Sequence, residues 1–243
     1  MTGATPQRLY LMQLSTSTVP IADRTLKMVL GCYLVETSDD KRILIDSGLP
    51  ADVQLPAAMP PVGQKKNVLE HLADLGLGPD DIDILICTHF DVDHAGYHDA
   101  FPKAELIVQR EHYELAKSGH PRFAAARHHW DHPALRYRLI EGDTELLPGL
   151  TLLETGGHTP GHQSVLVRLP QTGPVLLAID AVPLRSLFTP DRKKSPADDN
   201  EEQLRASTQK LLHLAEHEHV ALVIFGHDGE QWETLKKAPS YYE

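Results

Sequence analysis

The sequence contains very little cysteine, with two such residues among 243. A disulfide framework and a structural zinc site built on several thiolates are therefore not expected. Cys32 and Cys87 each lie in an apolar, strand-like stretch. We expect both to be buried free thiols, as is usual in a reducing cytoplasm, and not a disulfide pair.

Positive charge is also scarce, since 23 Lys and Arg stand against 34 Asp and Glu, for a formal net charge of -11. Binding to a nucleic-acid backbone needs clustered Lys and Arg, so neither nucleic acid nor an anionic membrane surface is expected as a partner. No apolar run approaches the roughly 20 residues of a membrane span. Residues 1–8 lack a basic segment followed by an apolar core. These absences predict a cytoplasmic location.

The most informative stretch that is present runs from His89 to His94 and holds four metal-capable side chains, His89, Asp91, Asp93 and His94. It directly follows residues 82–88, an apolar run that predicts a buried strand opening onto a site. A loop and a first helical turn after that strand would let the four side chains converge. Histidine together with carboxylate suits zinc, iron or manganese. The alternative is a polar loop with two histidines by chance.

Apolar periodicity, with glycine and proline between the segments, predicts a mixed α/β chain that forms one domain over residues 1–243, without repeats or a dividing linker. Strands are expected at 8–14, 29–36, 42–46, 82–88, 106–109, 139–141, 150–154, 164–169, 175–179 and 221–225, and helices at 67–75, 110–117 and 201–218, the last capped by Asp199 or Asn200. Composition predicts loops at 15–22, 49–63 and 191–200. Residues 120–132 mix His, Arg and aromatic residues, which predicts either an amphipathic surface helix or a lid beside a pocket.

Three further metal-capable residues follow apolar strands: His158 lies in a glycine-rich turn, Asp180 ends the strand 175–179, and His227 follows the strand 221–225. A lone buried carboxylate at Asp180 would be costly unless a cation neutralised it. Each residue alone has an ordinary interpretation as a polar loop residue. Their joint occurrence at strand ends, together with the hexamer, indicates a metal site.

Two other residues are candidates for supporting roles around that site. Asp46 ends the strand 42–46 just before Gly48, so it is either a plain turn residue or an anchor that orients a metal ligand. His162 follows a glycine turn, and it either supports a ligand or pocket or lies at the surface.

The series His89-x-Asp91-x-Asp93-His94, His158, Asp180 and His227 resembles the metallo-β-lactamase superfamily over nearly the whole chain. The nearest resemblance is to the N-acyl-homoserine lactonases, and it rests on Asp93-His94-Ala95-Gly96, on His158-Thr159-Pro160-Gly161-His162-Gln163-Ser164, on Gly226-His227-Asp228 and on the aromatic end Tyr241-Tyr242. Asp46-Ser47-Gly48 is similar to an early strand-end motif of the superfamily.

This resemblance implies a four-layer αββα sandwich of the metallo-β-lactamase type with two divalent metal ions, zinc first, at one edge of the paired sheets. By the same resemblance, His89, Asp91 and His158 would hold one ion, Asp93, His94 and His227 would hold the other, and Asp180 would bridge them. A homodimer is consistent with such relatives.

The chain departs from the family pattern at two positions. Asp91 stands where the motif has His, which adds a negative charge; we expect a less electrophilic first position, or one that favours manganese or iron. Pro183 stands where the lactonases carry a Tyr that contacts the substrate carbonyl, and a proline donates no hydrogen bond.

The expected activity is metal-dependent hydrolysis, in which a metal-bridging hydroxide opens a lactone or related ester and Asp93 carries a proton to the leaving alkoxide. Thioester hydrolysis, as in glyoxalase II, and phosphodiester hydrolysis remain alternatives on the same fold. A non-hydrolytic alternative is a di-iron redox or metal-binding module. The substrate is expected to be a small molecule. Its contacts are unknown, because the loops 15–28, 49–66, 119–135 and 183–200 carry no readable code.

Overall fold

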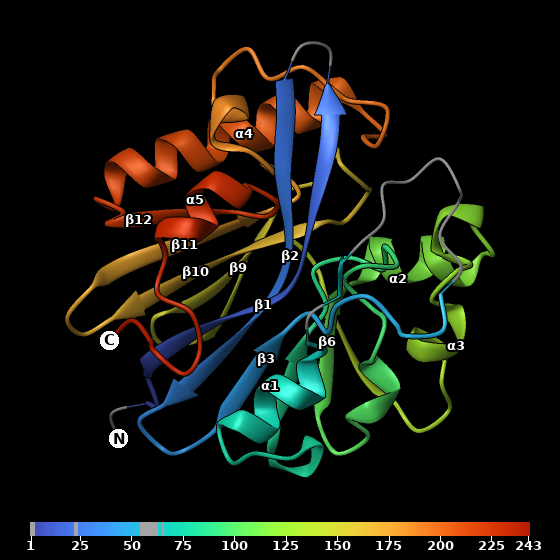
Figure 1. The fold of residues 1–243 in the computed structure, drawn as a ribbon, viewed down its shortest axis with the longest axis vertical. Helices are drawn as coiled ribbons and strands as arrows, with labels where there is room; N and C mark the ends of the chain where they lie inside the picture. Colours follow the sequence, from blue (N-terminus) through green and yellow to red (C-terminus); the bar gives the residue numbers. More distant parts are fainter. Residues whose placement is uncertain (1–2, 22–23, 54–62, 65) are drawn as a thin grey trace.

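The computed structural model describes residues 3–21, 24–53, 63–64 and 66–243, and its strands form two sheets packed face to face (Figure 1). The first sheet contains β1 (Pro6–Ile21), β2 (Arg24–Thr37), β3 (Arg42–Ile45), β4 (Gly63–Gln64), β5 (Ile84–Ile86), β6 (Glu105–Gln109) and β7 (Arg136–Ile140), in the order β4-β1-β2-β3-β5-β6-β7. The second contains β8 (Thr144–Leu147), β9 (Leu150–Glu154), β10 (Gln163–Leu169), β11 (Gly173–Ile179) and β12 (Leu222–Phe225), in the order β12-β11-β10-β9-β8.

A hydrophobic core fills the space between the two sheets. Because side chains alternate along a strand, Leu9 and Leu11 of β1 point to the same face, where they join Val165 and Val167 of β10 in one buried cluster. Trp232, from the short helix α5 (Gly229–Thr234), is buried in the same cluster. The inner faces of the two sheets therefore share one core.

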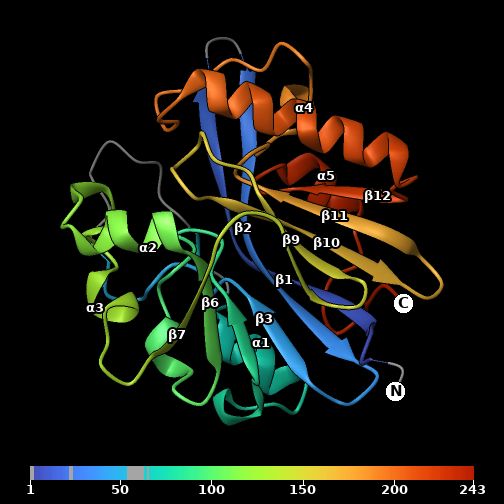
Figure 2. The same cartoon turned by 180° about the vertical axis from the view of Figure 1, so that it is seen from behind.

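Helices cover the outer faces of both sheets (Figure 2), and apolar strand residues on those faces are buried beneath them. The helices are α1 (Val68–Asp74), α2 (Arg110–Lys117), α3 (Arg127–Trp130) and α4 (Glu201–His217). Leu72 of α1 and Trp130 of α3 pack with Met12 of β1, whereas Leu211 of α4 packs with Leu166 of β10. The result is the expected αββα sandwich. No helix in the described part of the chain is both long and apolar enough to cross a membrane.

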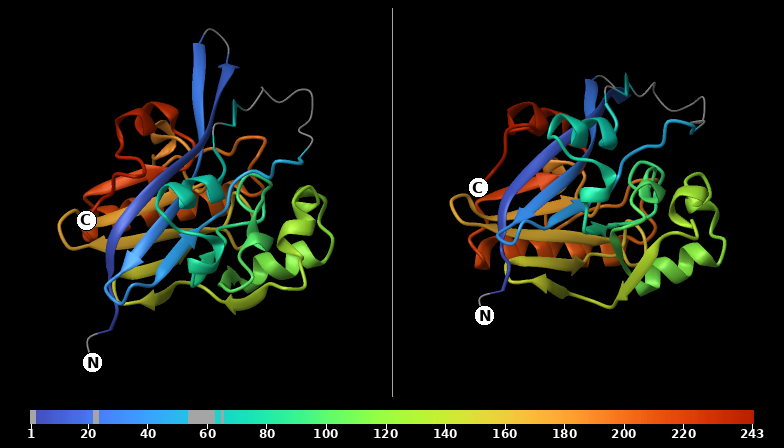
Figure 3. Two further views of the ribbon diagram at one scale, coloured as in Figure 1. Left: turned by 60° about the horizontal axis from the view of Figure 1, so that its bottom comes forward. Right: turned by 90° about the horizontal axis from the view of Figure 1, so that it is seen from below.

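The loop predicted at 15–22 was wrong for residues 15–21, which extend β1 into a long arm paired with β2 (Figure 3). The pairing runs without interruption from Ser15, opposite Leu30, to Ile21, opposite Arg24. Thr and Val are β-branched and favour extended backbone, so this segment can form a strand although its Ser and Pro content is typical of a loop. Ala22 lies outside the described residues.

A further composition-based prediction, the surface helix at 120–132, was wrong. Residues 120–132 form a 3-10 turn at Pro121–Phe123 and the short α3, not one surface helix, and both Phe123 and Trp130 are buried. The loop predicted at 191–200 is confirmed, although Arg192 and Asp198 within it are buried. Burial of a charged residue normally requires a partner, and Arg192 pairs with Asp198. Strand β8 and helix α5 were not predicted.

The candidate site residues lie at one end of the sandwich, where several strands end. β3, β5 and β6 run parallel, and β11 and β12 run parallel in the second sheet. Neighbouring parallel strands end at the same edge of a sheet. Asp46 follows β3, Asp180 follows β11, and His227 lies two residues after β12. Segments that are far apart in the sequence therefore meet where these strands end.

Candidate metal centre

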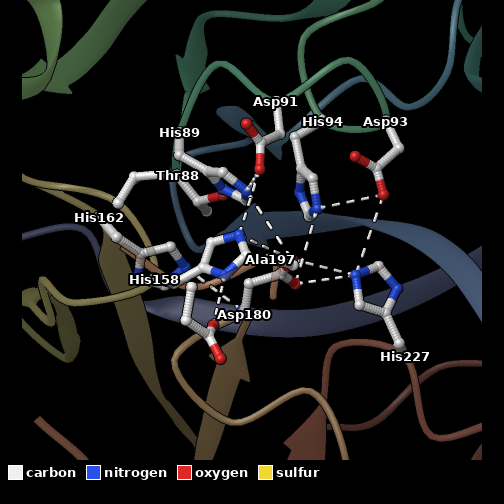
Figure 4. A network of polar contacts seen from close by, with 12 residues as sticks. Thr88, His89, Asp91, Asp93, His94, His158, His162, Asp180, Ala197 and His227 are labelled. Carbon is white, nitrogen blue, oxygen red and sulfur yellow. Dashed lines mark hydrogen bonds and ion pairs between the residues drawn. The ribbon is translucent and has the colours of Figure 1, made fainter. Parts of the chain in front are cut away.

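The seven side chains predicted to bind metal lie together at this end of the sandwich (Figure 4). Their ligand atoms form three overlapping groups, each within 4.8 Å: His89, Asp91 and His158; Asp93, His94 and His227; and His89, His94 and Asp180. Asp180 Oδ2 lies 3.3 Å from His158 Nε2, and its Oδ1 lies 3.0 Å from His227 Nε2. Two neighbouring groups thus share a central carboxylate.

Two of the four histidines are oriented by buried carboxylates. His94 Nδ1 lies 2.8 Å from Asp46 Oδ2, and His158 Nδ1 lies 2.9 Å from Asp198 Oδ1. A carboxylate accepts the proton of Nδ1, so each ring is fixed with Nε2 facing the other ligands. Asp46 therefore does more than form a turn, because it fixes the ring of a candidate ligand.

The other two histidines are oriented in the same sense by neutral oxygen atoms. His227 Nδ1 donates to the Val29 carbonyl at 2.8 Å. His89 Nδ1 lies 3.0 Å from Thr88 Oγ1, which itself donates to Asp46 Oδ2 at 2.7 Å. Because the hydroxyl proton is used on Asp46, Thr88 Oγ1 accepts from His89. All four imidazoles therefore direct Nε2 toward the common centre.

Coordination of a metal ion accounts for the buried polar atoms at the centre better than hydrogen bonds among them do. Among the described residues, His89 Nε2 and His94 Nε2 are buried and have no hydrogen-bond partner. An unpaired buried polar atom is costly, and such an atom in a folded protein calls for an explanation. Imidazole and carboxylate donors without sulfur suit zinc, manganese or iron. The donor set therefore fits a metal centre.

The electrostatics of the cluster also favour cations. Although burial opposes it, the Asp93 and Asp180 carboxylates raise the pKa of His94 to about 10. Asp180 likewise overcomes burial and raises the pKa of His227 to about 9. A buried site that stabilises positive charge on its imidazoles has a negative potential, which also stabilises divalent metal ions.

The backbone at the site is held in unusual conformations. Asp46 and Ile179 have φ values of 59° and 52°, which are strained for residues other than glycine and most of all for a β-branched one. Gly157 has a φ of 123°, and a Cβ there would lie 2.2 Å from the backbone nitrogen of Leu204. Only glycine lets the turn that carries His158 pass this close to α4.

A family model of the metallo-beta-lactamase superfamily matches residues 32–227. The chain belongs to this superfamily. The resemblance inferred from the motifs is confirmed, and the αββα sandwich is the metallo-beta-lactamase fold. The protein is accordingly a metal-dependent hydrolase.

Curated relatives cover most of the chain. An N-acyl homoserine lactonase from a Bacillus species is 34% identical over 233 residues, which are 89% of this chain and 88% of the relative. The N-acyl homoserine lactonase of Bacillus thuringiensis is 32% identical over 96% of this chain and 95% of its own length. One from Azorhizobium caulinodans is 35% identical over 76% and 72% of the two chains.

Solved structures give the same result. A quorum-quenching N-acyl homoserine lactone lactonase superposes with a TM-score of 0.85 at 31% identity, covering 98% of this chain and 99% of the other. A second lactone hydrolase, with the product N-hexanoyl-L-homoserine bound at its catalytic metal centre, matches with a TM-score of 0.85 at 30% identity, covering 98% and 100% of the two chains.

Within this superfamily fold, Arg122 contacts the first ligand group, a position that the sequence did not single out. Its Nε lies 2.7 Å from Asp91 Oδ1 and its Nη2 lies 2.6 Å from Asp91 Oδ2, a bidentate pair. Although burial has the opposite effect, this pair lowers the pKa of Asp91 well below its usual value. The extra carboxylate in the motif thus has a cationic partner of its own.

His162 and His112 support the backbone around the ligands. His162 is buried, and its Nε2 accepts a hydrogen bond from the backbone nitrogen of Asp180 at 3.3 Å. The surface interpretation of His162 was therefore wrong. His112 Nε2 accepts from the backbone nitrogen of Phe90 at 2.8 Å, and its Nδ1 donates to the Pro160 carbonyl at 2.7 Å. His112 joins the hexamer loop to the glycine-rich turn.

A fourth group of metal-capable side chains, Asp52, His128 and His129, shares no residue with the candidate centre. Asp52 Oδ2 lies 3.1 Å from His128 Nε2, and its Oδ1 lies 3.4 Å from His129 Nε2. Asp52 and His128 are exposed. Hydrogen bonds between Asp52 and the two rings explain this arrangement without a metal ion.

Replacing Asp198 by asparagine is expected to weaken metal binding about tenfold to a hundredfold, because an amide orients His158 less firmly than a carboxylate. A chelator-competition titration would measure the affinity. Asp191→Asn, an exposed residue in the same segment, should leave it unchanged. Asp198 also accepts from the Ser195 backbone nitrogen at 2.7 Å, so thermal unfolding should be recorded for each variant. Unaltered metal affinity in folded Asp198→Asn would show that this contact does not tune the site.

Proposed function

We propose that this chain is a dinuclear metal hydrolase that opens the ring of N-acyl homoserine lactones or of closely related lactones and esters. The observation that carries the proposal is the arrangement of two ligand groups around the shared Asp180 carboxylate. Relatives at 32–35% identity over most of the chain are named N-acyl homoserine lactonases, which supports this substrate class.

The proposed ligands of the first position are His89, Asp91 and His158, and those of the second are Asp93, His94 and His227, with Asp180 between them. When bound, two divalent ions would polarise the substrate carbonyl and acidify a water molecule. Zinc is the metal we propose, because imidazole and carboxylate in this number are its usual ligands. Manganese and iron are the alternatives, because Asp91 adds a carboxylate to the first group and carboxylate oxygens also bind harder ions.

Asp93 is proposed to move the proton that the leaving group needs. Its side chain is 25% exposed, compared with 17% for Asp91 and 7% for Asp180, so it is the most accessible of the three carboxylates. Its Oδ2 lies 3.8 Å from His94 Nε2 and 3.9 Å from His227 Nε2. A carboxylate at the edge of the centre can accept a proton from water and pass it to an alkoxide.

The remaining residues of the site are proposed to hold this geometry. Asp46 and Asp198 fix imidazole rings, and His162 holds the backbone that presents Asp180. Pro183 accepts a hydrogen bond from the backbone nitrogen of His227 at 2.9 Å. Because Pro183 has no donor of its own, substrate binding must rely on other groups.

We also propose that residues 1–243 form one domain, since both sheets bury side chains in the same core. A cytoplasmic location is supported by two buried free thiols, whose pKa values burial raises well above normal.

The negative net charge supports a small molecule, rather than nucleic acid or an anionic membrane, as the partner. A homodimer is the proposed assembly, to be tested by sedimentation.

A hydrolysis screen tests the substrate class. It should cover homoserine lactones of varied acyl length, aliphatic lactones, aryl esters, thioesters and bis-nitrophenyl phosphate, with metal content measured on the same sample. We expect the highest kcat/KM on a lactone. A higher value on a thioester or a phosphodiester would replace the proposal by that activity. Iron absorption bands that bleach on reduction, without hydrolysis, would favour a redox module.

A further inference from the structure

Arg122 is firmly held beside the first ligand group. Besides its bidentate pair with Asp91, its Nη1 donates to the Ala197 carbonyl at 2.8 Å and lies 3.0 Å from Asp199 Oδ1. Its side chain is only 18% exposed. A guanidinium does not lose its proton in a protein. A permanent positive charge therefore lies at the edge of the candidate centre.

Arg122 also contacts the one atom of His158 that a metal ion would need. Nη2 lies 2.9 Å from His158 Nε2. Because a guanidinium nitrogen can only donate, His158 Nε2 accepts this hydrogen bond while its Nδ1 faces Asp198. The same Nη2 donates to Asp91 Oδ2, which lies 3.2 Å from His158 Nε2 and 3.4 Å from His89 Nε2. Arg122 thus donates hydrogen bonds to the candidate metal-ligand atoms of two of the three residues in the first group.

The second group has no such cation. Within the described residues, the ion pairs of Asp93 and Asp180 are formed with histidines alone, and neither carboxylate contacts a lysine or arginine. The two groups therefore share Asp180 and have similar donors, but only the first has a fixed positive charge in contact with its ligand atoms.

We infer that Arg122 competes with the metal ion at the first position, so that the chain binds one ion tightly at the second position and the other more weakly. An ion that enters the first position must displace charge-assisted hydrogen bonds to Asp91 and His158, and it must approach a like charge. An arginine that only oriented Asp91 would not use the lone pair of His158. This inference rests on the proposed ligands and is independent of the substrate.

Zinc titration of chelator-treated protein, followed by calorimetry, tests the inference. The wild-type chain should show two resolved steps, the tight one absent from His227→Ala and the weak one absent from His158→Ala. Arg122→Gln should strengthen metal binding in the weak step by about tenfold to a hundredfold. This factor corresponds to the free energy of the hydrogen bonds to charged groups that the ion no longer has to displace. The tight step should stay within about twofold. Arg127→Gln, which removes an exposed arginine from the neighbouring α3, should change neither step.

Thermal unfolding provides a readout that does not depend on the calorimetric fit. Zinc should raise the melting temperature of Arg122→Gln more than that of the wild type, because ligand binding stabilises in proportion to affinity. If Arg122→Gln does not fold, Arg122→Lys serves instead. Lysine lacks the planar fork that reaches both Asp91 and His158, so the weak step should strengthen by a smaller factor.

Two results would overturn the inference: two wild-type steps of equal affinity, or a weak step that Arg122→Gln weakens or leaves unchanged. The latter would show that Arg122 supports Asp91 as a ligand. Absence of zinc binding to the wild-type chain would instead overturn the proposed ligands and the proposed function together.

Discussion

Replacing Asp180 by alanine is expected to remove most of the bound metal and to lower kcat/KM on the best lactone by about a thousandfold, which corresponds to about 4 kcal/mol of transition-state stabilisation. The physical reason is the position of the carboxylate between His158 and His227, at 3.3 Å and 3.0 Å from their Nε2 atoms. Without it, the histidines face one another around a cavity, and both ligand groups lose a negative donor. Metal per chain and kcat/KM should be measured on the same preparation.

Two companion variants keep this prediction interpretable. Asp180→Asn keeps the size of the side chain and separates loss of charge from loss of packing. Asp80→Ala removes an exposed carboxylate that pairs with Lys103 and should alter neither metal content nor rate. If Asp180→Ala folds and retains two ions per chain, Asp180 is not a shared ligand, and the proposed arrangement of the centre is wrong.

The part of the site that could be predicted from sequence is the part that lies at strand ends. Asp180 and His227 each follow an apolar strand, and a buried strand can end in a polar residue only where that residue finds a partner. The hexamer places His89 and His94 five residues apart on a single loop. These local patterns were sufficient to predict which side chains meet, because the strands that carry them are short and strongly apolar.

Two of the supporting residues, Arg122 and Asp198, could not be predicted, because their contacts depend on tertiary folding. Arg122 reaches Asp91 across 31 residues, and Asp198 reaches His158 across 40 residues. Both lie in polar segments whose composition resembles that of ordinary surface loops. Composition was misleading for the same reason in the arm at 15–21, where pairing with β2 overrides a loop-like sequence. Local propensity therefore failed wherever a distant partner decided the structure.

The charge of the centre illustrates how much one missed contact matters. From sequence, Asp91 in place of histidine predicts a less electrophilic first position or a harder metal. In the structure Arg122 pairs with Asp91 through both oxygen atoms and offsets the negative charge that the aspartate adds. Asp91 and Arg122 together form a neutral pair in the place of the family's histidine. Asp91 alone is therefore no reason to prefer manganese or iron over zinc. Metal analysis of protein purified without added metal would test this conclusion.

Replacing Asp93 by asparagine is expected to lower kcat by about a hundredfold to ten-thousandfold, the range of general acid–base catalysis, while metal content falls much less. Asparagine keeps the shape of the side chain but cannot carry a proton between water and the leaving group. Asp99→Asn, a half-buried residue nearby in the sequence that contacts His129 instead, is the matched control and should retain activity.

Substrates with different leaving groups distinguish a proton-transfer role of Asp93 from a metal-binding role. A nitrophenolate leaves without being protonated, whereas the alkoxide of an opened lactone needs a proton. Asp93→Asn should therefore impair lactone opening far more than nitrophenyl ester hydrolysis on the same preparation. An equal loss on both substrates, in proportion to lost metal, would mean that Asp93 acts as a ligand alone and that another group protonates the leaving alkoxide.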